Sequence, residues 1–241
     1  MSMKASTNEI VVEGTLYEKV SRELDGGAIA GEMIIEVPVT VGSKDFTSLI
    51  PVSFYAAPIT KAGKPNVAYK GIQTILEKGV SLSEADGDYT KADKIRVRNA
   101  QLGENMFFAQ GDRFVSFPRI RGNFFDRVKA TDVLPRANFK VKMIVAAINE
   151  EEVLDDGQMV GTGRLVVTGH VVQYNGEIDE IKFIVEQKKY VDFVEKKWSV
   201  GDTVAASGVI KYSTIETIEK DVEEEGFGEP IISTVTRKVH E

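Results

Sequence analysis

The chain has 241 residues, of which 42% are hydrophobic and 28% charged, a composition typical of a soluble globular protein with a sizeable core. It contains no cysteine, which excludes disulfides, thiolate nucleophiles and cysteine-ligated zinc. No apolar run is long enough for a transmembrane helix, and the first residues lack the apolar segment of a secretory signal. We therefore expect an intracellular protein without a membrane partner.

The net charge is −7, which at first argues against a polyanionic partner. The charge is unevenly distributed, however. Residues 94–142 contain eleven Lys or Arg and four Asp or Glu, a local charge of +7, whereas residues 216–229 contain seven acidic residues and only Lys220 as a base. Because salt limits the reach of charge to ~8–10 Å, the local field matters more to a polyanion than the net charge does.

β-Strand patterns dominate the chain. In order, the first three expected strands are 9–20, 32–41 and 46–57, all rich in β-branched residues. One helix is expected at 68–78, because Ile72, Ile75 and Leu76 follow helical spacing and Gly79 can end it. Later strands are expected at 94–99, 139–148, 164–173, 178–186 and 203–212, with a hairpin turn at 174–177. This order predicts an all-β protein with one short helix.

Two halves of the sequence share a pattern that indicates two small barrels. Gly111–Asp112 and Gly201–Asp202 each precede a strand that is broken by a proline or glycine and then continues with an apolar and a basic residue. Gly14 and Gly169 each interrupt the first strand of a hairpin, where a small barrel needs a sharp bend.

The segment 163–212 resembles an OB-fold, with its glycine-bent first strand, its hairpin and its late GDTVAASGVI run. The first half resembles a longer version with the helix inserted, and together the halves resemble the OB-fold single-stranded-DNA-binding proteins, particularly those of bacteriophages. The resemblance implies tandem OB-like barrels at 8–135, with a long insertion, and at 136–215, followed by an acidic segment and a strand at 216–241. It also implies a cytoplasmic protein, in the host cytoplasm if a phage encodes it.

The segment GDRFVSFPRIRGNFFDR, residues 111–127, mixes four phenylalanines with four arginines. Single-strand binding needs cations along the phosphates and flat rings under the bases. Past Pro118, Arg119 and Arg121 share a face and Ile120 points the other way. We expect Phe114 or Phe117 to stack and Arg113, Arg119 and Arg121 to contact phosphate; the alternative is that all four rings belong to the core, because Phe is among the residues most often buried. Arg96 and Arg98, opposite to Ile95 and Val97, would extend this track.

The segment KKYVDFVEKKW is a second candidate, a binding loop between two strands, with Lys188, Lys189, Tyr190 and Trp198 as predicted nucleic-acid contacts. Trp198 could instead close the bottom of the barrel. A third set contains Phe54, Tyr55, Lys61, Lys64, Tyr69 and Lys70, whose loop at 60–66 either covers a bound strand or is a solvated connection.

The acidic stretch 216–229 is typical of tails that recruit replication or recombination proteins, although a solvated loop between two strands explains it as well. The protein could also form homo-oligomers, because the edges of barrels can pair between chains.

Enzymatic signals are weak. The only histidines are His170 and His240, and no phosphate-binding loop with a Gly-Lys-Ser/Thr end occurs. The carboxylates of 150–156 look like a charged hairpin tip, so we expect no metal and no cofactor. The sequence therefore predicts a non-enzymatic single-stranded DNA-binding protein of phage-type replication or recombination. The alternative is a structural β-barrel protein of a phage virion.

Overall fold

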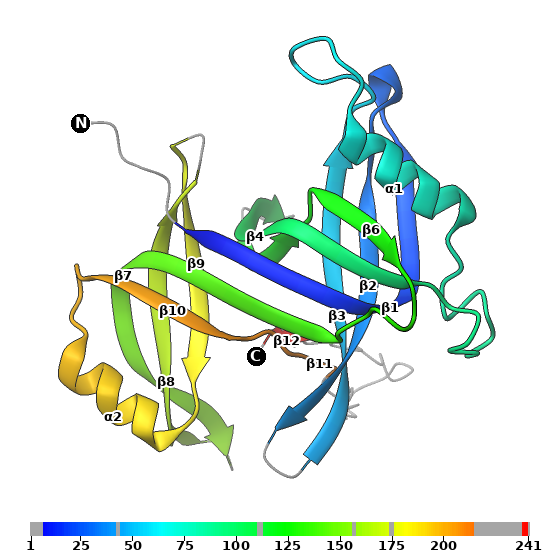
Figure 1. Ribbon diagram of the computed structural model, residues 1–241. Coiled ribbons are helices and arrows are strands. Elements are labelled where there is room, and N and C mark those ends of the chain that lie inside the picture. Colours follow the sequence, from blue (N-terminus) through cyan, green and yellow to red (C-terminus); the bar gives the residue numbers. More distant parts are fainter. Residues whose placement is uncertain are drawn as a thin grey trace, which may run out of the picture.

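The computed structural model describes residues 7–41, 44–109, 113–155, 158–173, 176–214 and 238–240. Two β-barrels lie side by side, and the two α-helices lie at opposite ends of the molecule (Figure 1). Helix α1 spans Val67–Lys78 and helix α2 spans Lys188–Lys197, and a 3₁₀ turn, η1, spans Asp25–Gly27.

The first barrel closes on itself. Strand β1 pairs antiparallel with β2 on one edge and with β4 on the other, while β3 pairs in parallel with β5 and β5 pairs antiparallel with β4. The circuit is therefore β1-β2-β3-β5-β4 and back to β1, with α1 inserted between β3 and β4, and β6 extends the β5 side of β4. The bounds are Asn8–Glu23 (β1), Ile29–Val41 (β2), Lys44–Ala56 (β3), Lys94–Ala109 (β4), Arg113–Arg121 (β5) and Phe124–Val128 (β6).

The second barrel repeats most of this order. Strands β7, β8 and β9 form an antiparallel meander, α2 follows, and β10 returns to pair with β7. Their bounds are Arg136–Asp155 (β7), Gln158–Val172 (β8), Ile178–Val185 (β9) and Thr203–Val209 (β10). Strands β11 (Tyr212–Thr214) and β12 (Lys238–His240) pair with each other.

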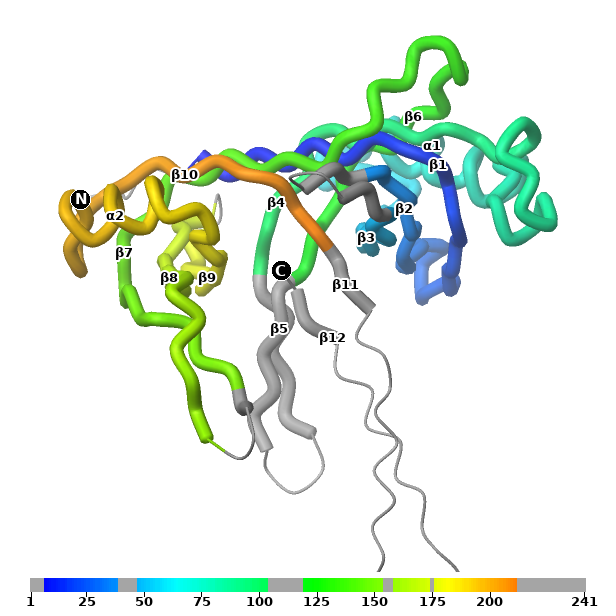
Figure 2. The backbone as a smooth tube through the Cα atoms, turned by 90° about the horizontal axis from the view of Figure 1, so that it is seen from below, coloured from blue at the N-terminus to red at the C-terminus, as the bar shows by residue number. Residues whose placement is uncertain are grey.

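One continuous sheet joins the barrels. Residues Asn8 to Glu13 of β1 pair with Val141 to Arg136 of β7, so that ten strands belong to a single sheet. Seen from below, β1, β7 and β10 run along one side of the molecule, and the β7–β8 hairpin projects away from that side (Figure 2). Leu102 and Phe139 pack against the cores of both barrels. The connection is thus a shared sheet with shared core side chains.

Alternation along the strands explains the first core. Ile95 and Val97 of β4 are fully buried, and the side chain of Arg96 between them points outward. Helix α1 buries Ile72 and Ile75 against the same core. The Asn66 side chain accepts a hydrogen bond from Ala68 N at the start of α1, and Lys19 Nζ donates to the carbonyl oxygens of Leu76 and Gly79 at its end. These contacts satisfy backbone groups that a helix leaves unpaired at its termini.

Gly14 lies at a close approach between two backbones. A Cβ atom there would stand 2.1 Å from the carbonyl oxygen of Glu36, so a side chain does not fit without moving β2. Glycine is therefore required at this position of β1 by crowding against β2, a reason different from the predicted bend.

All eight predicted strands and the helix at 68–78 are present, most of the strands with longer bounds. The expectation of a single helix was wrong, because KKYVDFVEKKW forms α2 instead of a loop. Val191 and Val194, spaced i and i+3, are its buried residues, and this pair was the helical signal that the many lysines obscured. The predicted turn at 174–177 falls partly outside the described residues, but β8 and β9 form the expected hairpin.

Candidate nucleic-acid interface

Arg119 and Arg121 lie on the outer face of β5, with Ile120 buried between them at 1% exposure. Arg119 Nε donates to Ser53 Oγ at 2.6 Å, and Ser53 Oγ donates to the carbonyl oxygen of Ile120 at 2.8 Å. The Arg119 guanidinium is thereby held against β3, and Arg121 is exposed. The predicted shared face of the two arginines is confirmed.

Tyr55 adds an aromatic ring to this face. It lies two residues after Ser53 on β3 and is 67% exposed, whereas its neighbour Phe54 points into the barrel and is 3% exposed. Phe54 packs edge-on against Phe125, with 5.8 Å between ring centroids. The sequence placed Tyr55 in a third set only. The alternation between Phe54 and Tyr55 was the signal that separated the core ring from the surface ring.

Arg98 and Phe124 continue the outer face on β4 and β6, where they are directly paired. The Arg98 guanidinium carbon lies 5.7 Å from the centroid of the Phe124 ring. Arg98 also forms a two-bond contact with Asp126, in which Nη2 lies 3.0 Å from Oδ1. Phe124 is half-buried and Phe125 is 3% exposed, so the rings of this segment divide between surface and core. We call the outward side chains of Tyr55, Arg119 and Arg121 the outer wall.

Arg96 faces outward from β4 but is bound to an acidic partner. Its Nη2 lies 2.7 Å from Glu13 Oε1. The Glu13 carboxylate also accepts hydrogen bonds from Leu134 N at 3.1 Å and from Arg136 Nη2 at 3.4 Å. Burial opposes ionisation of the Glu13 side chain, but hydrogen bonds from Arg96 and Leu134 and the charges of both arginines outweigh it, so the pKa of Glu13 lies below its ordinary value. Arg96 therefore has a structural contact besides its predicted role.

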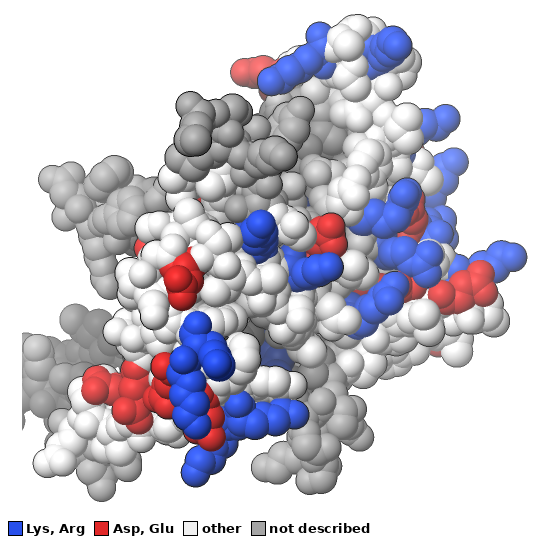
Figure 3. Space-filling model, turned by 60° about the vertical axis from the view of Figure 1, so that its left-hand side comes forward, with Lys and Arg blue, Asp and Glu red and all other residues white. Residues whose placement is uncertain are grey.

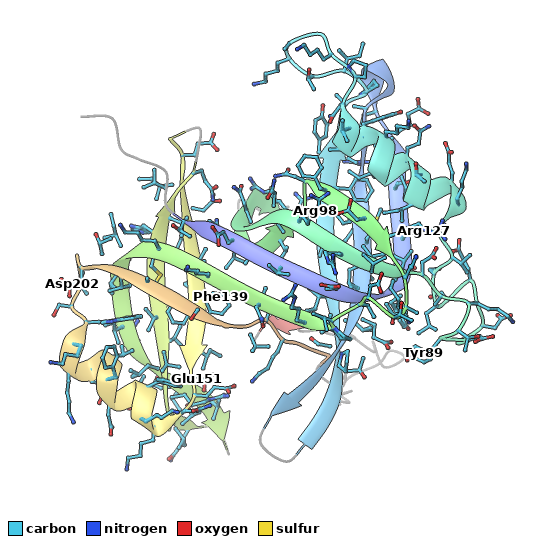
Figure 4. All side chains as sticks on the ribbon, viewed as in Figure 1. Tyr89, Arg98, Arg127, Phe139, Glu151 and Asp202 are labelled. Atoms are coloured by element: carbon cyan, nitrogen blue, oxygen red, sulfur yellow. The ribbon has the colours of Figure 1, made fainter. Side chains whose placement is uncertain are left out.

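The second set of predicted residues lies on a different part of the molecule. Lys188, Lys189 and Tyr190 are exposed on α2, with Lys189 Nζ 4.6 Å from the centroid of the Tyr190 ring. Trp198, which follows the helix, is half-buried against the second core. It packs edge-on against Phe183, with 6.4 Å between the ring centroids. In Figure 4, Arg98 and Arg127 lie beside α1 and β6, on the side of the molecule opposite to Glu151 and Asp202. The predicted residues whose side chains the structure describes thus fall into two groups, with Arg96, Arg98, Arg119 and Arg121 on the first barrel and the others on or directly after α2.

Acidic side chains accompany the basic ones. On the face shown in Figure 3, Lys and Arg atoms lie beside Asp and Glu atoms and form no separate basic stripe. Arg127, for example, pairs with Asp93 at 2.6 Å. The side chains of Arg113, Phe114 and Phe117, and the acidic segment 216–229, lie outside the part of the chain that the structure describes.

The described residues show neither a metal-binding cluster nor a membrane helix. No group of three His, Asp or Glu side chains among them is arranged to hold an ion. No described helix is long and apolar enough to cross a bilayer.

The closed five-strand circuit, its partial repeat and the helix between the third and fourth strands define an all-β chain of two tandem OB-fold-like barrels. Solved structures share this architecture. A deletion mutant of the single-stranded DNA binding protein from Thermus aquaticus matches with a TM-score of 0.53 and 14% identity over 88% of this chain and 89% of that one. The wild-type Thermus aquaticus protein matches with a TM-score of 0.50 and 15% identity over 87% of each chain. At such identities the likeness establishes the fold.

The chain belongs to the YorF family, whose sequence model matches residues 6–241. No curated protein matches the sequence.

Proposed function

We propose that this protein binds single-stranded DNA without catalysing a reaction, and that it acts in replication or recombination of the phage type that the sequence predicts. The observation that carries the proposal is the outer wall of the first barrel, where the guanidinium groups of Arg119 and Arg121 share a face with the exposed ring of Tyr55. The named function of the Thermus aquaticus neighbours supports it.

The chemistry of the outer wall suits a flexible strand. Guanidinium groups donate hydrogen bonds to phosphate, and a ring such as Tyr55 offers a flat surface to any base, since every base has a π face. Each stacked base contributes ~1–3 kcal/mol, and each neutralised phosphate adds about −0.7 to the slope of log affinity against log salt. A duplex hides its base faces, so the outer wall should prefer single strands.

Residues outside the outer wall extend the proposal. Lys188, Lys189 and Tyr190 on α2 would give a long strand a second contact on the other barrel, and Trp198 is the remaining predicted contact there. Arg96, Arg113, Phe114 and Phe117 stay predicted contacts of the first barrel. The acidic segment 216–229 is proposed to recruit replication or recombination proteins.

An equilibrium titration tests the proposal. Fluorescent oligo(dT), oligo(rU) and a duplex of equal length are titrated with the protein at two salt concentrations. We expect saturable binding to oligo(dT) that weakens with salt and exceeds binding to the duplex at both concentrations. Absence of oligo(dT) binding at low salt refutes the proposal. Light scattering on the same samples tests the virion alternative, because large defined assemblies formed without DNA favour it.

A further inference from the structure

A groove lies between helix α1 and strand β6, beyond the edge of the outer wall. Its volume is about 360 Å³, and its lining includes Val67, Lys70 and Thr74 of α1 and Arg98, Phe124 and Arg127 of the sheet. The helix comes close to β6 at Gly71, where a Cβ atom would stand 3.3 Å from the carbonyl oxygen of Phe125. The groove is therefore formed by two packed elements of the first barrel.

The charge of the groove suits an anion. Lys70, Arg98 and Arg127 supply three positive charges to its lining, and Asp126 supplies one negative charge. Arg98 and Arg127 are paired with Asp126 and Asp93, and both remain partly exposed, at 58% and 41% of their side chains. No ion pair joins Lys70 to another described residue, and Lys70 is exposed. A phosphate in the groove would meet the Lys70 ammonium and the exposed guanidinium edges.

The groove also contains a ring. Phe124 is half-buried in its lining, and the Arg98 guanidinium lies 5.7 Å from the ring centroid. Val67, 76% exposed at the start of α1, adds an apolar side chain to the opposite wall. The groove therefore offers a ring on which a base can stack and cations that can contact the phosphates.

The groove continues the outer wall. Strands β5 and β6 run along the same side of β4, separated only by Gly122 and Asn123, so that Arg121 precedes Phe124 by three positions. Tyr55 lies at the end of β3, and the loop after it leads directly into α1, tied down by the Asn66 side chain, which donates to the carbonyl oxygen of Ala57 at 2.8 Å. A strand that passes Arg119 and Arg121 therefore reaches the groove without crossing the barrel.

We infer that the groove between α1 and β6 is a second subsite for single-stranded DNA, in which Phe124 carries a base and Lys70 contacts a phosphate. The inference rests on the proposed function and extends it, because the DNA path then leaves the sheet surface and turns over the helix. It commits the groove to a nucleic-acid strand instead of a peptide or a second copy of this chain.

Two variants of the whole chain test the subsite. Phe124→Leu keeps an apolar side chain but removes the ring, and Lys70→Gln removes one charge at an exposed position where folding is not at risk. Lys78→Gln, at an exposed lysine in the last turn of α1 and outside the groove, is the matched control. Each protein is titrated with oligo(dT) of about 6 and of about 20 nucleotides. The shorter length falls within the site size of a single OB-fold, and the longer one exceeds it.

The subsite predicts that Phe124→Leu weakens binding of the long oligonucleotide about tenfold and leaves its salt slope nearly unchanged. It predicts that Lys70→Gln lowers the magnitude of that slope by about 0.7. The short oligonucleotide, which the outer wall can hold alone, should bind all variants equally.

Three results would overturn the subsite. If both groove variants bind the long oligonucleotide like the wild type while substitution of Arg119 and Arg121 weakens binding, the groove is not used and the proposed function stands. If the wild type binds neither oligonucleotide, the proposed function fails together with the subsite. If the groove variants change self-association in light scattering but not DNA affinity, the groove belongs to a protein contact.

Discussion

Arg136, the first residue of β7, lies with its Nη2 3.4 Å from Oε2 of Glu13 on β1, and the Glu13 side chain is completely buried. The other oxygen of the same carboxylate, Oε1, forms an ion pair with Arg96 of β4. One acidic group therefore holds the strand that begins the second barrel and a strand of the first barrel together, in the region where β1 pairs with both β4 and β7.

Glu13→Gln should destabilise the protein. The amide keeps the size of the side chain but leaves the guanidinium groups of Arg96 and Arg136 without their counter-charge. A fully buried pair broken in this way costs about 3–5 kcal/mol; because both arginines are partly exposed, we expect about 1–3 kcal/mol in the free energy of unfolding. Urea denaturation measures it. Glu18→Gln, at an exposed residue of the same strand, is the control and should change stability by less than about 0.5 kcal/mol.

Acid should remove the contribution of Glu13. Its folded pKa lies below the ordinary value of 4.5, so its stabilisation is fully present above that value and is lost as the pH falls through the folded pKa. The unfolding free energy of the wild type should therefore fall below pH 4.5, and that of Glu13→Gln should fall less steeply over the same range. Parallel curves for the two proteins would show that Glu13 does not titrate as the structure implies.

Phe139→Ala should weaken both barrels together. Phe139 packs against both cores, and its ring centroid lies 6.0 Å from that of Phe183. A fully buried Phe→Ala change costs about 3–5 kcal/mol, and this half-buried ring should cost about 2–4 kcal/mol. Because the proposed domains 8–135 and 136–215 share this ring and one sheet, a single unfolding transition should shift as a unit. Two separate transitions would mean that the barrels unfold independently. Phe193→Ala, at an exposed ring on α2, is the control.

Much of this architecture could be predicted from local patterns. Alternation placed Ile95 and Val97 inside and the arginines beside them outside, because one buried face leaves a period of two in the sequence. The pairing of β1 with β7 could not be predicted, since it depends on the register between strands far apart in the chain. For the same reason no pattern revealed that Glu13 would form an ion pair with Arg96. Nor did a pattern reveal that the Phe124 ring would stay half-exposed while its neighbour Phe125 entered the core.

Tyr55→Ala should weaken single-strand binding without changing its salt dependence. The ring is exposed and carries no charge, so its loss removes stacking of ~1–3 kcal/mol, roughly 5- to 150-fold in affinity, and releases no additional counterion. Fluorescence anisotropy with oligo(dT) at several salt concentrations measures both quantities. Tyr55→Phe retains the ring and should bind like the wild type. Equal affinity of all three proteins would exclude Tyr55 from the interface.

The salt dependence of oligo(dT) binding by the Arg119→Gln/Arg121→Gln double variant tests the central claim most directly. If both guanidinium groups neutralise phosphate, the slope of log affinity against log salt should be smaller in magnitude than that of the wild type by about 1.4, at about 0.7 for each lost contact. A Lys78→Gln/Lys91→Gln variant, with the same change of charge at exposed positions away from the outer wall, should keep the wild-type slope. A double arginine variant whose slope equals that of the wild type would contradict the assignment of the outer wall to DNA.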